Sequence, residues 1–189
     1  ALEKSLAWAD ATLMGANTLR VHKSTCLIHN QLLINKRREV GLEDQPISVV
    51  ISRRADFSSK WMFFNQPIRR WLISQANSER SSHSYQRFER QMIIRNNWQA
   101  TLKQLTNEGI KNLLLLGGAN LACSLLKEDQ IDELYLTLTP KVIGGGYSWI
   151  PAEINDLPEK LRKDSAWSLE KYFELGNDEL MVCYSRNKL

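Results

Sequence analysis

Short apolar runs alternate with helix-like segments along most of this chain, and this alternation limits the folds that it can adopt. The apolar runs are four to five residues long and are bounded by glycine or polar residues: 11–14, 47–51, 71–74 and 112–116. Helical patterns lie around and between them: 2–9, 17–21, 29–40, 98–108 and 118–127. A chain that alternates strands and helices in this way folds as an α/β protein around a mostly parallel sheet.

The C-terminal part of the chain has a different pattern. Further strands are predicted at 90–95 and 134–138, and the segments 168–174 and 180–185 are joined by Gly176-Asn177-Asp178, which is typical of an antiparallel hairpin. We expect this hairpin to add antiparallel strands at one edge of the sheet. The Ser-rich stretch 75–84 is expected to form an exposed loop. The sequence thus predicts an α/β three-layer sandwich with a mostly parallel central sheet and a C-terminal antiparallel hairpin.

The length and composition favour one soluble domain. With 189 residues and 43% hydrophobic content, the chain can build one sizeable core, and a single domain over 1–189 is expected. No apolar stretch approaches the roughly 18 residues needed to cross a bilayer, and the first ten residues lack the apolar core of a secretory signal. The cysteines are far apart and lack metal-ligand spacing: Cys26, Cys123 and Cys183. This pattern favours reduced thiols in a cytoplasmic protein over a disulfide or a zinc site.

The net charge of +4 has three possible reasons: nucleic-acid binding, a solvated basic face, or ligands that carry phosphates. Nucleic-acid binding is disfavoured, because the lysines and arginines are dispersed. The local group Lys36-Arg37-Arg38 lies in a polar helical segment, and we expect it to form a solvated face. A mildly positive net charge also suits a protein whose ligands carry several phosphates, which is the explanation we prefer.

The tryptophans are expected in the core or in an interface: Trp8, Trp61, Trp71, Trp98, Trp149 and Trp167.

The segment NLLLLGGANLACSLL at 112–126 places two glycines between an apolar strand and a helix. A helix N-terminus presents unpaired backbone N–H groups and a partial positive charge. Glycine lets an anionic ligand approach that backbone closely, and a phosphate or pyrophosphate is the usual occupant. Because the third glycine of the common dinucleotide motif is missing, a simple tight turn between strand and helix explains the pattern equally well.

The segment VVISRR at 49–54 ends another strand with a hydroxyl group and two guanidinium groups. Ser52 can donate a hydrogen bond to a phosphate oxygen, and Arg53 and Arg54 can form charge-assisted bonds to it. Such groups suit the 2′-phosphate of NADP, whereas an NAD site usually offers a carboxylate to the ribose. Exposed arginines are common, so a solvated basic strand end is the alternative.

The Ser-Arg-Arg segment precedes the glycine pair, with 65 positions between Ser52 and Gly117, and each lies at the end of a predicted strand. Together they resemble the dihydrofolate-reductase-like superfamily. Within it, the chain most resembles the riboflavin-biosynthesis pyrimidine reductases, which form the C-terminal domain of a bacterial bifunctional deaminase-reductase. The segments ADATLMGANTL at 9–19 and DELYLTLTPKVIGGG at 132–146 are similar to further elements of that family. The resemblance covers most of residues 8–150, and no zinc signature of a deaminase is found in the sequence.

The resemblance implies an NADPH-dependent oxidoreductase of riboflavin biosynthesis that acts on a phosphoribosylaminopyrimidine, similar to a 5-amino-6-(5-phosphoribosylamino)uracil reductase. Hydride transfer to C1′ would open the sugar to a ribityl chain; the cofactor supplies that chemistry and the protein supplies the alignment. It also implies a homodimer that binds a small phosphorylated substrate. We expect no metal, nucleic acid or membrane as a partner, and a cytoplasmic location.

The resemblance also assigns roles to individual residues. Contacts to the 2′-phosphate would come from Ser52, Arg53 and Arg54. The pyrophosphate would meet the backbone of Gly117, Gly118, Ala119, Asn120 and Leu121, and the nicotinamide half would be bordered by Gly15 and Thr18. Candidates for the substrate phosphate are Arg20, Lys23 and His29. His22 is a candidate proton donor, because imidazole exchanges protons near neutral pH; a loop histidine without a role is an equal alternative.

Several positions depart from the family pattern. His22 stands where Asp is common, Leu116 where Glu is common, and His29 near a frequent Arg position. The first strand of the family, with its Ser-Leu-Asp-Gly-like segment, is not found before Ala1. We expect the protein to have this strand and the given sequence to begin after it, because a sheet without that strand would expose the strands beside it. Two alternatives therefore stay open: a pteridine or dihydrofolate-like reductase, and a non-catalytic NADP-binding protein.

Overall fold

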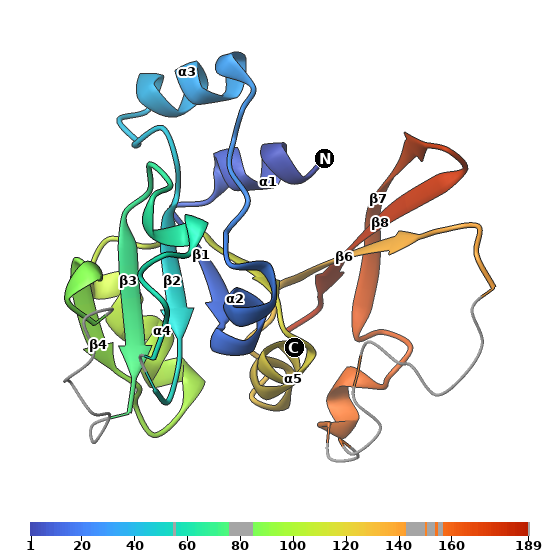
Figure 1. Ribbon diagram of the computed structural model, residues 1–189. Helices are drawn as coiled ribbons and strands as arrows, with labels where there is room; N and C mark the ends of the chain where they lie inside the picture. The colour runs from blue at the N-terminus through green and yellow to red at the C-terminus, as the bar shows by residue number, and fades with distance from the viewer. Residues whose placement is uncertain (55, 76–84, 143–149, 151–153, 155–156, 189) are drawn as a thin grey trace. The chain divides into compact units, whose positions relative to one another are not determined.

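The structure, a computed structural model, describes residues 1–54, 56–75, 85–142, 150, 154 and 157–188 (Figure 1). The chain divides into two compact units, Ala1–Gly118 and Ala119–Leu189. The first is built on a parallel sheet and the second on an antiparallel one. The expectation of a single domain over 1–189 stays a prediction.

A five-stranded sheet in the order β4-β3-β2-β1-β5 is the frame of the first unit. Its strands have these bounds: β1 Ala11–Gly15, β2 Ile47–Ile51, β3 Arg70–Ser74, β4 Arg90–Ile93 and β5 Leu113–Gly117. Every neighbouring pair is parallel, with Gly15 opposite Ile51 and Met14 opposite Gly117. All five strands therefore end along one edge of the sheet, and the predicted parallel α/β architecture is confirmed.

Helices accompany this sheet in the described residues of the first unit: α1 Leu2–Trp8, α2 Ala16–His22, α3 Gln31–Glu39, α4 Trp98–Asn107, and the short 3-10 helices η1 Met62–Phe64 and η2 Tyr85–Arg87. Asparagine side chains cap two of them. Asn30 accepts hydrogen bonds from the backbone N–H groups of Leu32 and Leu33 in the first turn of α3, and Asn97 accepts one from Ala100 in the first turn of α4. The α-helices lie within two residues of the bounds expected from the sequence, whereas the 3-10 helices had no counterpart there.

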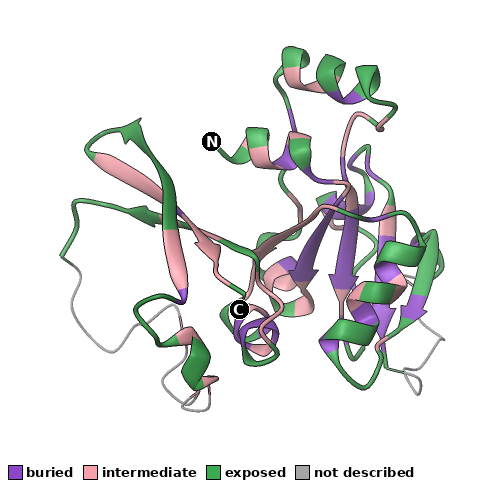
Figure 2. Ribbon diagram, turned by 180° about the vertical axis from the view of Figure 1, so that it is seen from behind, coloured by how far each residue is buried: buried purple, intermediate pink, exposed green. Residues whose placement is uncertain are grey.

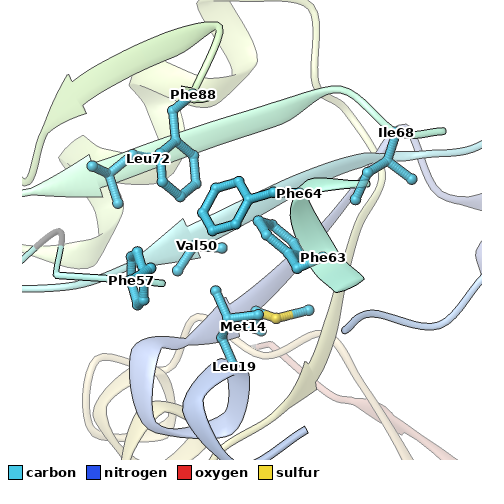
Figure 3. Close-up of a cluster of buried hydrophobic side chains, with 9 residues drawn as sticks. All are labelled: Met14, Leu19, Val50, Phe57, Phe63, Phe64, Ile68, Leu72 and Phe88. Carbon is cyan, nitrogen blue, oxygen red and sulfur yellow. The ribbon is translucent and has the colours of Figure 1, made fainter. Parts of the chain in front are cut away.

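A cluster of buried apolar side chains covers one face of the sheet (Figure 3): Met14, Leu19, Val50, Phe57, Phe63, Phe64, Ile68, Leu72 and Phe88. Met14, Val50 and Leu72 occupy matching register positions on three adjacent strands, so their side chains share a face. The phenylalanines pack on them from η1 and from the segments that follow β2 and η2. Leu19 joins α2 to the same core, which fixes α2 beside the sheet.

The second unit holds a three-stranded antiparallel sheet in the order β6-β8-β7. Its described elements are α5 Ala119–Lys127, β6 Glu133–Leu138, η3 Glu159–Leu161, β7 Trp167–Gly176 and β8 Glu179–Arg186. Asn177 and Asp178 join β7 to β8 with φ angles of 52° and 58°, a backbone twist that matches the two-residue turns of tight hairpins. The predicted hairpin is confirmed, but it pairs with β6 in a sheet of its own instead of extending an edge of the parallel sheet.

Arg37 is buried, which corrects the expectation that Lys36-Arg37-Arg38 is a solvated face. It is 2% exposed, and its guanidinium donates to four backbone carbonyls: Leu6, Ala7, Ala9 and Glu43. Carbonyls at the end of a helix have no partner within that helix. Arg37 supplies those partners for α1, and it thereby fastens α3 to α1 where the two helices pack.

Two tryptophans lie in the core as expected, whereas for the exposed Trp8 the other expected location, an interface, stays a prediction. Figure 2 distinguishes buried from exposed segments; Trp71 and Trp98 are buried, whereas Trp8 is 55% exposed and is not a core residue. Trp149 and most of the expected 75–84 loop lie outside the described residues. In the part of the chain that the structure describes, no helix is both long and apolar enough to cross a bilayer.

Candidate functional site

Three segments that the sequence singles out lie at the carboxyl edge of the parallel sheet. Gly15 ends β1, Ser52 follows β2, and Gly117 ends β5. Because β1 lies between β2 and β5 in the sheet, the ends of β2 and β5 are two strand spacings apart, roughly 10 Å. One phosphorylated dinucleotide is long enough to reach both segments.

The chain order reverses at this same position. From β1 the chain moves outward through β2 and β3 to β4, and it then returns to the other side of β1 for β5. In open α/β sheets, the connections around such a reversal leave in opposite directions, so a crevice forms beyond the carboxyl ends of the strands and ligands bind there. The ends of β1 and β5 flank this point.

Gly117 and Gly118 have backbone angles that favour glycine. Their φ values are 129° and 100°, which side-chain-bearing residues rarely adopt. Apart from Gly117 itself and its two chain neighbours, no heavy atom of a described residue lies within 4 Å of the position that a Cβ of Gly117 would take, so the requirement comes from the backbone and the space above it is open. Gly15, by contrast, has a φ of −77° and caps α2 with an ordinary conformation. Leu116 packs against the apolar core cluster.

Ser52 and the two arginines after it differ in their contacts. Ser52 is 6% exposed, and its hydroxyl donates to the Arg54 carbonyl while accepting from the Arg54 N–H at 3.2 Å. The hydroxyl thus shapes the turn, and it would have to exchange that bond to donate to a phosphate. Arg53 and Arg54 are exposed, and neither guanidinium has a hydrogen bond or ion pair to any described residue.

Arg20, on α2, has a partner that the sequence did not suggest. Its Nη2 lies 2.5 Å from Oδ1 of Asp56, and its guanidinium carbon lies 5.4 Å from the centroid of the Phe57 ring. In this structure Arg20 is therefore engaged with the segment after β2, and it is not free to hold a substrate phosphate. Thr18, half-buried on the same helix, lies between Gly15 and Arg20 in sequence.

His22 and Lys23 are exposed at the far end of α2. His22 is the last residue of this helix, which places it roughly 10 Å along the axis from Gly15. Lys23 follows with a φ of 56°, and its carbonyl accepts from the Phe63 N–H at 2.9 Å. Within the described residues, the His22 ring has no hydrogen-bond partner.

His29 lies at the opposite edge of the parallel sheet from Gly15, Ser52 and Gly117. Its backbone N–H donates to Glu3 of α1 at 2.9 Å, and α1 leads directly into the amino end of β1. His29 also lines an open hollow of about 590 Å³ between the starts of α1 and α3. The length of β1, roughly 15 Å, separates this edge from Gly15. The structure therefore does not bring His29 together with Arg20 and Lys23, because the chain runs back along the sheet after α2.

The remaining candidates belong to the second unit. Ala119, Asn120 and Leu121 form the first turn of α5, directly after the glycine pair in sequence. In the described ranges, no group of three His, Cys, Asp or Glu side chains is placed to hold a metal ion. Sequence reasoning missed Asp56 and Phe57; the signal available was their position, immediately after the Ser-Arg-Arg segment.

Comparisons with known proteins agree with this arrangement. A family model described as the RibD C-terminal domain matches residues 1–178. The chain is similar to the 2,5-diamino-6-ribosylamino-4(3H)-pyrimidinone 5′-phosphate reductase of Archaeoglobus fulgidus, with 24% identity over 148 residues, 76% of this chain and 68% of that protein. It is 25% identical over 185 residues to the protein of the same name from Methanothermobacter thermautotrophicus, covering 93% of this chain and 79% of the relative.

Solved structures share the fold at lower identity. A pyrimidine reductase-like protein from Corynebacterium diphtheriae superposes with a TM-score of 0.78 at 20% identity, covering 99% of this chain and 79% of the other. Acinetobacter baumannii RibD gives 0.73 at 17%, covering 98% of this chain and 49% of that one. The Thermotoga maritima diaminohydroxyphosphoribosylaminopyrimidine deaminase/5-amino-6-(5-phosphoribosylamino)uracil reductase gives 0.71 at 16%, covering 98% and 48%. The chain thus spans about half of these last two, and the expected dihydrofolate-reductase-like fold is confirmed.

Proposed function

Because the chain belongs to the RibD C-terminal domain family, we propose that it is an NADPH-dependent reductase that acts on a phosphoribosylaminopyrimidine in riboflavin biosynthesis. The names of its archaeal relatives support this reaction class, since both are reductases of a ribosylaminopyrimidinone phosphate. The observation that carries the proposal is the placement of a glycine pair and an arginine pair on either side of β1, at one edge of a parallel sheet.

The residues at this edge fit a nicotinamide dinucleotide. Gly117 and Gly118 expose backbone that an anionic group can approach, because neither has a side chain and their φ angles turn the chain sharply. Arg53 and Arg54 offer guanidinium groups without partners among the described residues. A guanidinium can bind a phosphate with two parallel hydrogen bonds. This supports NADPH over NADH as the cofactor, because only NADPH carries a 2′-phosphate that the arginines could bind.

The chemistry divides between the cofactor and the chain. A nicotinamide cofactor supplies a hydride when bound. Opening of the sugar ring breaks the bond between C1′ and O4′, so O4′ must gain a proton when C1′ gains the hydride. His22 is our candidate for this proton, since it is exposed at the end of α2 and its ring is free of partners among the described residues. Gly15 and Thr18 line the start of the same helix and would border the reacting atoms.

Cofactor titration tests the proposal most directly. The wild-type protein is titrated with NADPH and NADH, and so is Arg53→Ala. We expect the wild type to prefer NADPH. We also expect the substitution to weaken NADPH binding about 10-fold or more, the size of a lost hydrogen bond to a charged group, with NADH binding unchanged. Equal affinity of the wild type for the two cofactors would contradict the role of the arginine pair.

The substrate class is tested by following NADPH oxidation with the pyrimidine phosphate before and after ring deamination, and with dihydrofolate. Turnover with either pyrimidine and none with dihydrofolate is the expected result. Tight NADPH binding without oxidation by either pyrimidine would favour the non-catalytic alternative.

We also propose that the protein is a homodimer. β7 is an outer strand of its sheet, and large apolar side chains along it are exposed, among them Leu169, Tyr172 and Phe173. Exposed apolar surface of this kind is typical of interaction sites, and most soluble assemblies are symmetric dimers. A monomeric mass by light scattering at micromolar concentration would contradict this proposal. The cytoplasmic location stays a prediction.

A further inference from the structure

Arg20 links α2 to the segment that presents the exposed Arg53 and Arg54. Its ion pair with Asp56 and its position over the Phe57 ring put one side chain in contact with two successive residues of that segment. A cation over an aromatic face gains electrostatic attraction in addition to the ion pair. The contact therefore restrains the segment in two directions.

Phe57 is the point at which this segment enters the core. It is 5% exposed, and its ring centroid lies 5.9 Å from that of Trp61 and 6.0 Å from that of Phe88. At the other end, the Ser52 N–H donates to the Ile73 carbonyl at 3.0 Å. The two ends of the segment are therefore fixed, and Asp56 lies between Phe57 and the arginines.

Asp56 is the one acidic residue in the sequence 52–57, which also carries Arg53 and Arg54. It is two residues from Arg54, a backbone span of no more than about 7 Å. That distance is shorter than the Debye length of about 8 Å at physiological ionic strength. A free carboxylate at this position would repel a phosphate bound by the arginines, and the ion pair with Arg20 neutralises it.

We propose that Arg20 is a positioning residue for cofactor selection: by holding and neutralising Asp56, it lets the segment after β2 accept the 2′-phosphate of NADPH. This inference rests on the proposed use of NADPH. It gives Arg20 a role different from the substrate-phosphate contact that the sequence suggested, because the structure pairs its guanidinium with Asp56. Arg20 then acts through Asp56 and does not touch the cofactor itself.

Equilibrium titration of four proteins with NADPH and NADH tests this: the wild type, Arg20→Gln, Asp56→Asn and the double variant. For Arg20→Gln we expect NADPH binding to weaken about three- to fivefold, the effect of an exposed charge pair, and NADH binding to stay unchanged. Asp56→Asn should bind NADPH as tightly as the wild type or more tightly. The double variant should recover wild-type affinity, because the repelling carboxylate is absent.

Two further measurements separate this electrostatic role from a structural one. The loss of NADPH affinity in Arg20→Gln should become smaller at 0.5 M salt. The Debye length is then about 4 Å, so interactions between exposed charges that lie further apart are largely screened. Arg38→Gln is the matched control: it removes another exposed ion pair, in which Arg38 of α3 lies 2.6 Å from Asp44. This control should leave the affinity for both cofactors unchanged.

The outcomes distinguish this inference from the proposed function. If Arg20→Gln weakens NADPH and NADH binding equally, or if the double variant stays as weak as Arg20→Gln, then Arg20 does not act through Asp56 and the inference is wrong. In that case the proposed function survives, provided that Arg53→Ala still lowers the preference for NADPH. A wild type that binds neither cofactor would remove the proposed function itself.

Discussion

The two edges of the parallel sheet use arginine in opposite ways. At the amino edge, Arg37 is buried and its guanidinium donates to backbone carbonyls at distances of 2.7 to 3.2 Å. At the carboxyl edge, Arg53 and Arg54 are exposed and have no such bond to any described residue. A guanidinium carries five N–H donors in a fixed fork. A guanidinium whose donors are bonded to backbone carbonyls stabilises the fold, whereas one whose donors are exposed can bind a phosphate.

The carboxylates of the two edges also differ in whether they contact the main chain or a side chain. Glu3, at the amino edge, accepts from the backbone N–H groups of His29 and Asn30 at 2.9 and 2.8 Å. It therefore acts as a structural cap that joins α1 to the start of α3. Asp56, at the carboxyl edge, pairs with the Arg20 side chain. The amino edge is held by contacts to the main chain, whereas the carboxyl edge depends on side-chain charges that a charged ligand can perturb.

The largest effect is expected from Arg37→Met at the amino edge. The substitution leaves buried carbonyls without donors, so we expect a loss of about 3 to 5 kcal/mol in the free energy of unfolding. For a chain of this size, the thermal midpoint should fall by roughly 10 °C or more. Calorimetry measures this directly. Lys36→Gln, at an exposed neighbouring position, is the control and should change the midpoint little.

Arg37→Met also tests the division between the edges. The folded variant should bind NADPH as the wild type does at a temperature well below its midpoint. A selective loss of NADPH affinity would break the comparison, because it would tie the amino edge to cofactor binding.

A smaller effect is expected from Gly117→Ala at the carboxyl edge. The φ of 129° strains any residue with a side chain, at a cost of about 1 to 3 kcal/mol in stability. Because the backbone itself would meet the pyrophosphate, NADPH and NADH binding should both weaken, unlike the selective effect of Arg53→Ala. Stability and both affinities are measured on the same preparation.

Gly41→Ala is the matched control for this prediction. Gly41 follows α3 at the amino edge, has a φ of 77°, and has no heavy atom of the described residues near the position of its missing Cβ. A similar loss of stability with unchanged cofactor affinity would sharpen the comparison. Equal effects of the two substitutions on affinity would show that backbone strain alone is responsible.

The smallest effect is the pH dependence of the Glu3 cap. The backbone N–H groups of Asn30 and His29 hold the pKa of the Glu3 carboxyl below its ordinary value of 4.5. A lowered pKa in the folded state means that the stabilisation is complete above the ordinary pKa and is lost as the pH falls through the folded value. The thermal midpoint of the wild type should therefore exceed that of Glu3→Gln at neutral pH, and the difference should shrink as the pH falls below the ordinary pKa of 4.5. A difference that persists unchanged at low pH would contradict the ionic cap.

Much of the fold could be predicted from the sequence because the governing signals are local. The apolar run before Gly117 and the β-branched run before Ser52 have the length and neighbours of buried strands. Asn177-Asp178 has the turn chemistry of a hairpin, and the structure confirms it. The partner of that hairpin was not predictable, since pairing with β6 depends on contacts between residues far apart in sequence.

The candidate site also has parts that local sequence could predict and parts that it could not. The glycine pair and the Ser-Arg-Arg segment could be found because each joins a strand to a loop within a few residues, and parallel strands of one sheet end at one edge. The family resemblance grouped His29 with Arg20 as a contact to the substrate phosphate, yet the chain carries His29 along the whole sheet to the other edge. Closeness in sequence beyond one helix turn carries little information about closeness in space.

The sequence by itself therefore determined which segments form strands and helices, and which carry glycine or guanidinium groups suited to phosphates. These properties depend on backbone preference and side-chain chemistry, which act over a few residues. Only the tertiary structure decided which arginines are buried and which are exposed. Arg37 and Arg53 look alike in sequence, but packing surrounds Arg37 with the carbonyls of α1, whereas the end of β2 leaves Arg53 in solvent.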